Sequence, residues 1–153
     1  MSLRMVRTSL LILAGFTLIV MSAKGVASTT LPPLPNPVLN FLGQEFVTIR
    51  GKDFTRYNYQ VENLADYPKA LFAAAPQLPP CGANTNASRT WVDIYDQRGV
   101  RLNGFCALGG PNDLSSIWFA LERDVLPPSY VYIEMTDRQT NTKYKSNLAD
   151  TTM

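Results

Sequence analysis

The sequence predicts an all-β fold, an antiparallel β-sandwich of about seven strands. Three observations support this class. Short runs in which apolar and polar residues alternate recur along the chain. Turn-forming residues separate these runs at intervals of about eight to twelve positions. No stretch has the period of an amphipathic helix, so helices are not expected to form the layers of the fold.

Residues 1–27 have the pattern of a secretory signal peptide. Arg4 and Arg7 precede an apolar run at 10–21, and the small residues 25–27 provide a cleavage site. The apolar run is about a dozen residues, short of the roughly 20 that span a bilayer, so an uncleaved anchor is the lesser alternative. We therefore expect a periplasmic or secreted protein with no stable membrane span after cleavage.

The remaining chain has the size and charge of one nearly neutral domain. Cleavage would leave 126 of the 153 residues, enough for a single core. Three of the 14 basic residues and none of the 12 acidic residues lie in the first 27 positions, which leaves 11 basic against 12 acidic groups. With no run of lysine or arginine, nucleic acid is not expected as a partner.

The N-terminal part of the remainder predicts a leader and two strands. Residues 28–37 contain four prolines and predict an extended leader. A single β-sandwich domain is expected over 38–153. Its first strand is predicted at 46–50, because 43–45 interrupts an earlier short run, and its second strand at 54–62.

A long loop and a hairpin follow. Strand signals stop over 63–87, where prolines are frequent, and 69–75 is expected to form one helical turn or a short edge strand. Residues 89–106 predict a complete β-hairpin in which Gly99 takes a positive φ in the turn. Further strands are predicted at 115–121, 130–136 and 143–148.

The two cysteines, Cys81 and Cys106, are expected to form one disulfide. Paired cysteines are the simplest arrangement in an exported chain. Closing this loop would stabilise the fold by about 3 to 3.5 kcal/mol in the chain-entropy model. Two separately buried thiols are the alternative. A catalytic thiol would lack an activating histidine, because the chain has none.

Residues 126–133, Leu-Pro-Pro-Ser-Tyr-Val-Tyr-Ile, carry a resemblance to a known family. An apolar residue, prolines and a tyrosine that lead into an alternating strand resemble the tyrosine corner of fibronectin type III domains, which are immunoglobulin-like sandwiches. In that family the tyrosine follows a crossing between the sheets, and its hydroxyl bonds the preceding backbone. The resemblance covers about residues 46–148 and implies that Tyr130 is the corner residue.

The same resemblance assigns the neighbouring elements. It implies that the hairpin at 89–106 corresponds to the third strand and its successor, and that 115–121 precedes the corner. Residues 78–82 and 89–95 are also similar to small secreted bacterial proteins. That second similarity implies no activity and therefore adds no mechanism.

The absence of histidine limits the chemistry. It excludes Ser-His-Asp and Cys-His catalysis and any histidine-ligated metal, and two cysteines cannot complete a thiolate zinc site. We therefore expect no catalytic residue, metal or cofactor. Oxygen donors that calcium could use occur in loops, without EF-hand spacing, and turn formation explains them equally well. These donors are Asn84, Asn86, Asn112, Asp113 and Asp137.

Two carboxylates keep an enzymatic alternative open. Asp93 and Glu134 lie on predicted strands, and glycoside hydrolysis needs two carboxyl groups about 5 to 10 Å apart. A small carboxylate hydrolase that acts on glycans is therefore the second function class. A solvated strand face, or a cross-strand arginine partner, explains the same residues without catalysis.

Outward aromatic side chains support the preferred function. If Val92, Ile94, Val131 and Ile133 line the core, alternation places four rings on the opposite face. These rings are Trp91, Tyr95, Tyr130 and Tyr132. Such a patch could bind a glycan or a protein, or its rings could pack under the 63–87 loop. The preferred function is an exported, non-catalytic binding module.

Overall fold

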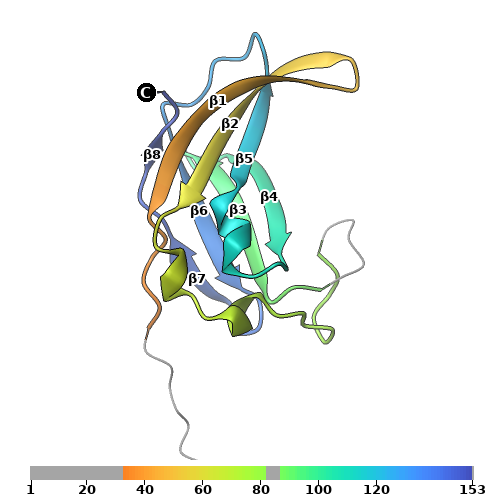
Figure 1. The fold of residues 1–153 in the computed structure, drawn as a ribbon, viewed down its shortest axis with the longest axis vertical. Coiled ribbons are helices and arrows are strands. Elements are labelled where there is room, and N and C mark those ends of the chain that lie inside the picture. The colour runs from red at the N-terminus through yellow and green to blue at the C-terminus, as the bar shows by residue number, and fades with distance from the viewer. Residues whose placement is uncertain (1–32, 82–86, 153) are drawn as a thin grey trace, which may run out of the picture. The chain divides into compact units, whose positions relative to one another are not determined.

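A computed structural model describes residues 33–81 and 87–152. The signal peptide predicted at 1–27, and residues 28–32 of the leader, lie outside the described residues. The predicted fold class is confirmed, because the described chain forms two antiparallel sheets and its helical segments are short 3-10 turns. The two sheets lie face to face (Figure 1).

The smaller sheet has three strands in the order β1-β2-β5. They are β1 (Leu39–Ile49), β2 (Lys52–Val61) and β5 (Ile117–Glu122). The first strand predicted at 46–50 is wrong in its start. Gly43 takes a φ of 134° at a bulge next to Phe41 and so absorbs one extra residue without ending the strand.

The larger sheet has five strands. They are β3 (Thr90–Asp96), β4 (Arg101–Ala107), β6 (Tyr130–Asp137), β7 (Thr142–Lys145) and β8 (Ala149–Asp150). Their order is β4-β3-β6-β7, and β8 also pairs with β6. The hairpin and the strand predicted at 130–136 are confirmed, and Gly99 has a φ of 83° in the hairpin turn.

The strand predicted at 143–148 is wrong in its end, because β7 ends at Lys145 and β8 begins only at Ala149. The division occurs at Ser146, whose backbone N–H donates to the Ile133 carbonyl and whose hydroxyl accepts the Ile133 N–H. The Ser146 hydroxyl thus accepts the hydrogen bond from the Ile133 N–H that the Ser146 carbonyl would accept in a regular ladder. The following residue, Asn147, bonds β1 instead of β6.

Apolar side chains from both sheets form one core. The inward positions of β3 and β6 that alternation predicts are fully buried, and in β2 and β5 Tyr59 stacks on Phe119 with ring centroids 6.0 Å apart. The inward residues of β3 and β6 are Val92, Ile94, Val131, Ile133 and Met135. The alternation along these strands therefore determines which face each side chain occupies.

The 63–87 segment packs against this core at one end of the sheets. It forms two 3-10 turns, η1 (Leu64–Asp66) and η2 (Lys69–Phe72), the second of which lies where a helical turn is predicted. Leu71 and Phe72 are buried in the core, and the Thr90 hydroxyl donates to the Leu71 carbonyl. A third 3-10 turn, η3 (Pro111–Ser115), precedes β5.

The described end of the leader contacts the same segment. Residues 33–37 form no strand, as predicted, and the carbonyls of Pro35 and Asn36 accept hydrogen bonds from Tyr67 and Asn63. Within the ranges that the structure describes, no helix has the length and hydropathy needed to cross a membrane.

Candidate functional site

The four rings singled out in the sequence lie on the outer face of the five-stranded sheet. Trp91 and Tyr95 alternate with buried residues of β3, and Tyr130 and Tyr132 do so in β6. All four are at least partly exposed, and Tyr130 is 43% exposed. We call these rings and the charged side chains around them the aromatic face. Its charged members are Asp93, Arg101, Glu134, Lys143 and Lys145.

A stacked tyrosine pair lies on this face. Tyr95 and Tyr132 are opposite each other in the β3–β6 register, and their ring centroids are 5.3 Å apart with an interplanar angle of 21°. From β7, on the other side of β6, the Lys145 Nζ lies 4.0 Å from the Tyr132 ring centroid. Tyr132 therefore has a ring on one face and a cation on the other.

Partial burial affects the acid–base chemistry of Tyr95. Burial raises the pKa of Tyr95, and the carboxylates of Asp93 and Glu134 raise it further. The Tyr95 phenol therefore stays protonated over the physiological range and can act as a hydrogen-bond donor.

Arg101 organises the tryptophan side of the face. Its guanidinium lies 5.7 Å from the Trp91 ring centroid, and its Nε donates to Asp93 Oδ1 at 2.5 Å. Gly104 is the cross-strand neighbour of Asp93, and a Cβ there would overlap the Arg101 guanidinium and the Asp93 carboxylate. The missing side chain therefore gives Arg101 room to lie across the strands.

The sequence reasoning did not identify Arg101 as part of the site. A register shift between Ile94 and Tyr95 pairs Tyr95 with Arg101, so that Leu102 is the extra residue. Without that bulge, alternation would have turned Arg101 toward the other face. The positive charge so close to the hairpin turn was the only sequence signal for it.

The two carboxylates proposed for catalysis are direct cross-strand neighbours. Asp93 on β3 is opposite Glu134 on β6. Each has its own cation, because Arg101 bonds Asp93 and the Lys143 Nζ donates to Glu134 Oε1 at 2.7 Å. The hydrogen bond to Glu134 raises the pKa of Lys143. The fold thus brings the two carboxylates together on an open face, where each is already paired with a cation.

The disulfide borders the aromatic face. Cys106 is the cross-strand neighbour of Trp91, and it bonds Cys81 with a Cα–Cα distance of 6.0 Å. The predicted disulfide is confirmed. It holds the end of the long segment beside the tryptophan.

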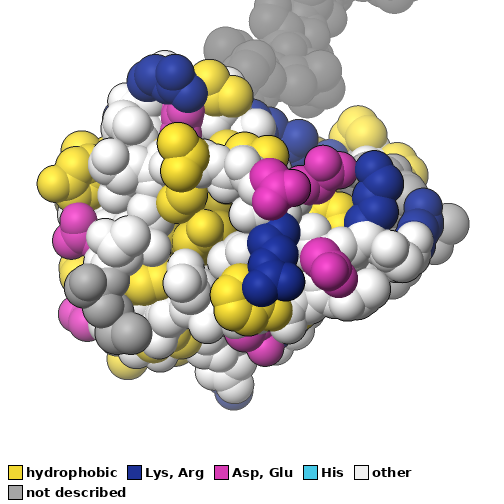
Figure 2. Space-filling model, turned by 90° about the horizontal axis from the view of Figure 1, so that it is seen from above, with side chains coloured by type: hydrophobic (Ala, Val, Ile, Leu, Met, Phe, Trp, Pro, Cys, Tyr) yellow, Lys and Arg dark blue, Asp and Glu magenta, His cyan; other side chains and the backbone are white. Residues whose placement is uncertain are grey.

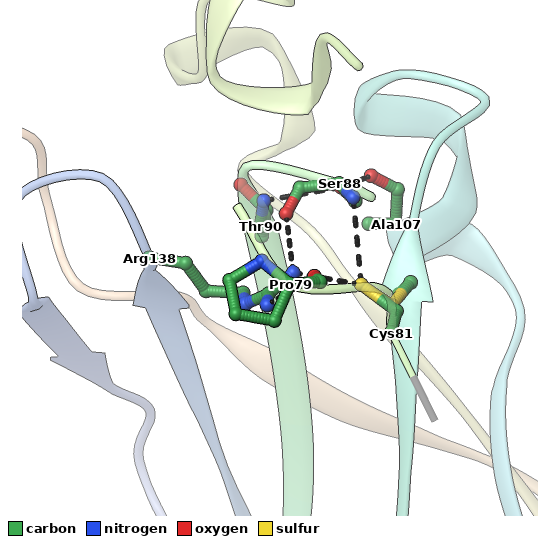
Figure 3. The surroundings of a disulfide bond; sticks show 7 residues. Pro79, Cys81, Ser88, Thr90, Ala107 and Arg138 are labelled. Carbon is green, nitrogen blue, oxygen red and sulfur yellow. Dashed lines mark hydrogen bonds between the residues drawn. A yellow bond between two sulfur atoms is a disulfide. The ribbon is translucent and has the colours of Figure 1, made fainter. Parts of the chain in front are cut away.

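Arg138, at the end of β6, fixes the same region (Figure 3). Its guanidinium donates to the Pro79 and Ser88 carbonyls at 2.7 and 2.9 Å and lies 3.0 Å from the Cys81 Sγ. The Ser88 hydroxyl donates to the Ala107 carbonyl on β4. The chain on both sides of 82–86 is therefore anchored to the five-stranded sheet.

A largely buried ion pair secures the base of this sheet. Arg89 donates to both carboxylate oxygens of Asp137, at 2.8 and 2.7 Å. Burial raises the pKa of Asp137, but hydrogen bonds from Arg89, Thr140 and the Gln139 N–H outweigh it, so that the pKa is lowered overall. The pair joins the beginning of β3 to the end of β6.

In the described part of the 63–87 segment, the packing does not support the alternative in which this segment covers the rings. Tyr67, Leu71 and Phe72 from that segment belong to the main core, and none of the four rings does. The segment closes one end of the sandwich, and the aromatic face lies on the outside of one sheet.

Two of the oxygen donors considered for calcium have other partners in the structure. Asp137 binds Arg89, and Asp113 accepts the Gly109 N–H at 2.7 Å. Asn84 and Asn86 lie outside the described residues. In the part of the chain that the structure describes, no three His, Cys, Asp or Glu side chains are grouped so that they could hold a metal ion.

An open hollow of about 640 Å³ lies between η1, η2 and the segment that leads into η3. Its lining is mostly apolar, and Lys69 is its one charged residue. Neither Asp93 nor Glu134 lines this hollow or two smaller ones on the described surface. The carboxylate pair therefore lies outside these concave sites.

Comparisons with known proteins give no match. No family model, no curated protein and no solved structure matches this chain.

Proposed function

We propose that this protein is an exported, non-catalytic module that binds a protein partner through its aromatic face. One observation carries the proposal: four aromatic rings stand partly exposed on the outer face of a sheet, on adjacent strands. Tryptophan, tyrosine and arginine are the residues most enriched at the centres of protein interfaces. The face combines all three.

The hydrogen-bonded strand that carries two of the rings supports a binding role. Trp91 and Tyr95 lie on β3, which is hydrogen-bonded to β4 on one side and to β6 on the other. A strand bonded on both sides loses little further freedom when a partner docks. The disulfide and Arg138 hold the adjacent segment in place in the same way.

The ring environment favours a protein over a glycan. Sugar rings bind aromatic side chains by stacking on a free ring face. Both faces of Tyr132 are occupied, and Arg101 lies over Trp91. Ring edges, hydroxyls and paired charges remain available, and these suit the mixed polar and apolar surface of a protein.

The location outside the cytoplasm is part of the proposal. Disulfides persist in oxidising compartments, and the Cys81–Cys106 bond supports such a compartment. The signal pattern at 1–27 supports it independently.

A resemblance to fibronectin type III domains remains a proposal as well. β5 lies in one sheet and β6 in the other, so Tyr130 follows a crossing between the sheets, and this supports the resemblance. Tyr130 is 43% exposed, however, which differs from a buried corner tyrosine.

Alanine substitution tests the binding proposal. The variants Trp91→Ala and Tyr132→Ala should each abolish binding to a partner purified by the wild-type protein from the cell envelope or the medium. Their melting temperatures should stay within a few degrees of the wild type, because both side chains lie on the outer face. A large loss of stability would show that the rings serve the fold instead.

The other sheet offers a matched control. Trp118 is 39% exposed on β5, and the Arg56 guanidinium lies 5.7 Å from its ring centroid, as Arg101 does from Trp91. Trp118→Ala should leave binding unchanged. If only this variant lost binding, the binding surface would lie on the three-stranded sheet instead. Binding to a glycan array that depends on Tyr132 would replace the protein partner with a glycan.

A carboxylate hydrolase is the second candidate, because Asp93 and Glu134 are direct neighbours across β3 and β6. Side chains at such positions have Cβ atoms about 4.5 to 5.5 Å apart, which is compatible with the spacing of glycosidase carboxylates. Turnover of polysaccharides that is lost in Asp93→Asn and Glu134→Gln, both still folded, would favour this candidate over the binding module.

A further inference from the structure

The outer edge of β1 is a long edge strand without the usual protection. β1 is at the edge of the three-stranded sheet, and residues 43–49 continue from the bulge to the hairpin turn without a further register shift. Among the described residues, no backbone hydrogen bond reaches the outer side of this stretch. It contains no proline or lysine, and its one charge, Glu45, binds Arg56 of β2. We call residues 43–49 the free edge.

Other edges of the two sheets are protected. β7 has only four residues and carries Lys143 and Lys145. The edges of β4 and β5 are joined by the Asn103 side chain, whose Nδ2 donates to the Trp118 carbonyl at 2.8 Å. Short strands, lysines and covering side chains are devices that prevent edge-to-edge pairing. Among the described residues, none of these devices covers the backbone of the free edge, and the Arg123 guanidinium lies 4.8 Å from the Phe46 ring centroid.

The beginning of β1 shows what such protection does. The Asn147 side chain accepts the Leu39 N–H at 2.7 Å and donates to the Leu39 carbonyl at 3.0 Å. A single amide thereby occupies both backbone groups that a neighbouring strand would use. Protection ends there, and the free edge begins after the bulge.

Exposed apolar side chains accompany the free edge. Phe46 is 69% exposed, and Ile49 is 42% exposed. The hairpin turn projects past the end of β5 (Figure 1), and apolar side chains lie among charged ones at that end (Figure 2). A partner strand would therefore find open backbone groups and an apolar side chain at the same place.

The free edge is compatible with a second copy of itself. Phe46 is the central residue of 43–49, so a two-fold axis through Phe46 pairs all seven residues in an antiparallel register. Phe46 would then lie against its own copy, and Glu45 would face Val47, so the one acidic side chain would not meet its copy. The bulge and the hairpin turn limit the pairing at both ends.

We propose that two copies of this chain associate through the free edge of β1, antiparallel and centred on Phe46, to form one continuous sheet from the two three-stranded sheets. The aromatic face belongs to the other sheet, so both copies of it remain available in the dimer. The proposal is independent of what the aromatic face binds.

Solution mass tests the association. Sedimentation equilibrium of the purified protein should give a dimer, and Phe46→Lys should give a monomer with an unchanged circular dichroism spectrum, because the exposed side chain is replaced by like charges on the axis. Leu126→Lys is the matched control, since Leu126 is 90% exposed in the loop between β5 and β6. It should leave the dimer intact. A monomeric wild type, or dissociation by Leu126→Lys alone, would overturn the proposal.

Cysteine substitution tests the register. Phe46→Cys places two thiols across the axis and should form an intermolecular disulfide on mild oxidation, seen as a dimer on a non-reducing gel. Thr48→Cys should not, because Thr48 would face Gln44 of the other copy. Equal cross-linking of the two variants would overturn the centred register.

Discussion

Each outer face of the sandwich has a tryptophan beside an arginine that is paired with a carboxylate, but the strands that hold the two tryptophans differ. On the five-stranded sheet, Trp91 lies near Arg101, which binds Asp93. On the three-stranded sheet, Trp118 lies near Arg56, which binds Glu45, and the ring-to-guanidinium distance is again 5.7 Å. A tryptophan beside a paired arginine is therefore not sufficient to define a binding site.

The difference lies in what holds each group. Trp91 is on a strand paired on both sides and next to a disulfide, whereas Trp118 is on the edge strand β5. The five-stranded face also has the stacked tyrosine pair. The comparison teaches that the pairing of the supporting strand and the stacked tyrosines, rather than the tryptophan–arginine group, distinguish the candidate site.

Removal of the disulfide should give the largest effect, because only the five-stranded sheet has this covalent tie. Cys81→Ser combined with Cys106→Ser should lower the free energy of unfolding by about 3 kcal/mol, the loop-closure value for this length. Urea denaturation of the variant and of the reduced wild type should agree. A loss below about 1 kcal/mol would show that the Arg138 contacts hold the segment without the bond.

The two sheets should also differ in their ion pairs. Asp137→Asn should cost about 3 kcal/mol, because it leaves Arg89 without its carboxylate in a mostly buried pair. Glu45→Gln on the exposed Glu45–Arg56 pair should leave the free energy of unfolding nearly unchanged. Chemical denaturation of both variants measures the difference. Equal costs would contradict the assignment of Asp137 as a structural anchor.

The same carboxylate predicts the acid side of the stability curve. The pKa of Asp137 is lowered in the folded state, so its contribution is fully present above its ordinary pKa of 3.8 and is lost as the pH falls through the folded value. Stability should therefore decline below about pH 4. In Asp137→Asn this part of the decline should be absent, as urea midpoints over a pH series would show.

A smaller change should strengthen the three-stranded sheet. Arg50 and Gly51 have φ values of 52° and 79° in the β1–β2 turn, the pattern of a type I′ turn. Arginine is unfavourable at such a φ and asparagine is preferred, so Arg50→Asn should stabilise the protein by roughly 0.5 to 1 kcal/mol. The thermal unfolding midpoint measures this gain. A loss would mean that the Arg50 side chain makes a contact that outweighs the strain.

The smallest expected effect on stability is that of Gly104→Ala, and tryptophan fluorescence is the measurement that detects this change. Gly104→Ala should displace the Arg101 guanidinium from Trp91, since the new Cβ overlaps flexible side-chain ends. Stability should change by less than about 1 kcal/mol. Tryptophan fluorescence should shift, whereas Ala120→Ser, at the cross-strand neighbour of Arg56, should leave it unchanged. An unaltered spectrum in Gly104→Ala would show that Arg101 does not rest on the ring.

The sequence predicted the elements that alternation specifies. In β3 and β6 every second side chain is apolar, and these strands and the direction of their rings were predicted correctly. β1 was shortened in the prediction because Gly43 is typical of a break, although here it forms a bulge. The β7–β8 division depends on the Ser146 side chain, which no periodicity reveals.

The sequence predicted which side of the sheet the site residues occupy, but not the contacts that they make there. Alternation placed Tyr95 and Tyr132 on the same side, but their stacking requires that β3 and β6 be neighbours, and sequence order gives no such information. Arg101 reached the face through a register shift, and Lys145 through the pairing of β7. The pairing of strands that are far apart in the sequence thus determines these contacts, and local sequence patterns do not contain that information.

The Asn147 side-chain amide joins the start of β1 to the segment between β7 and β8. It bonds a residue 108 positions earlier, so the first strand is completed by one of the last residues of the chain. Proteolytic loss of the residues after Lys145 would leave the Leu39 backbone groups unpaired and extend the unprotected edge toward the start of β1. Amide hydrogen exchange at Leu39 would then report on the integrity of a segment at the opposite terminus.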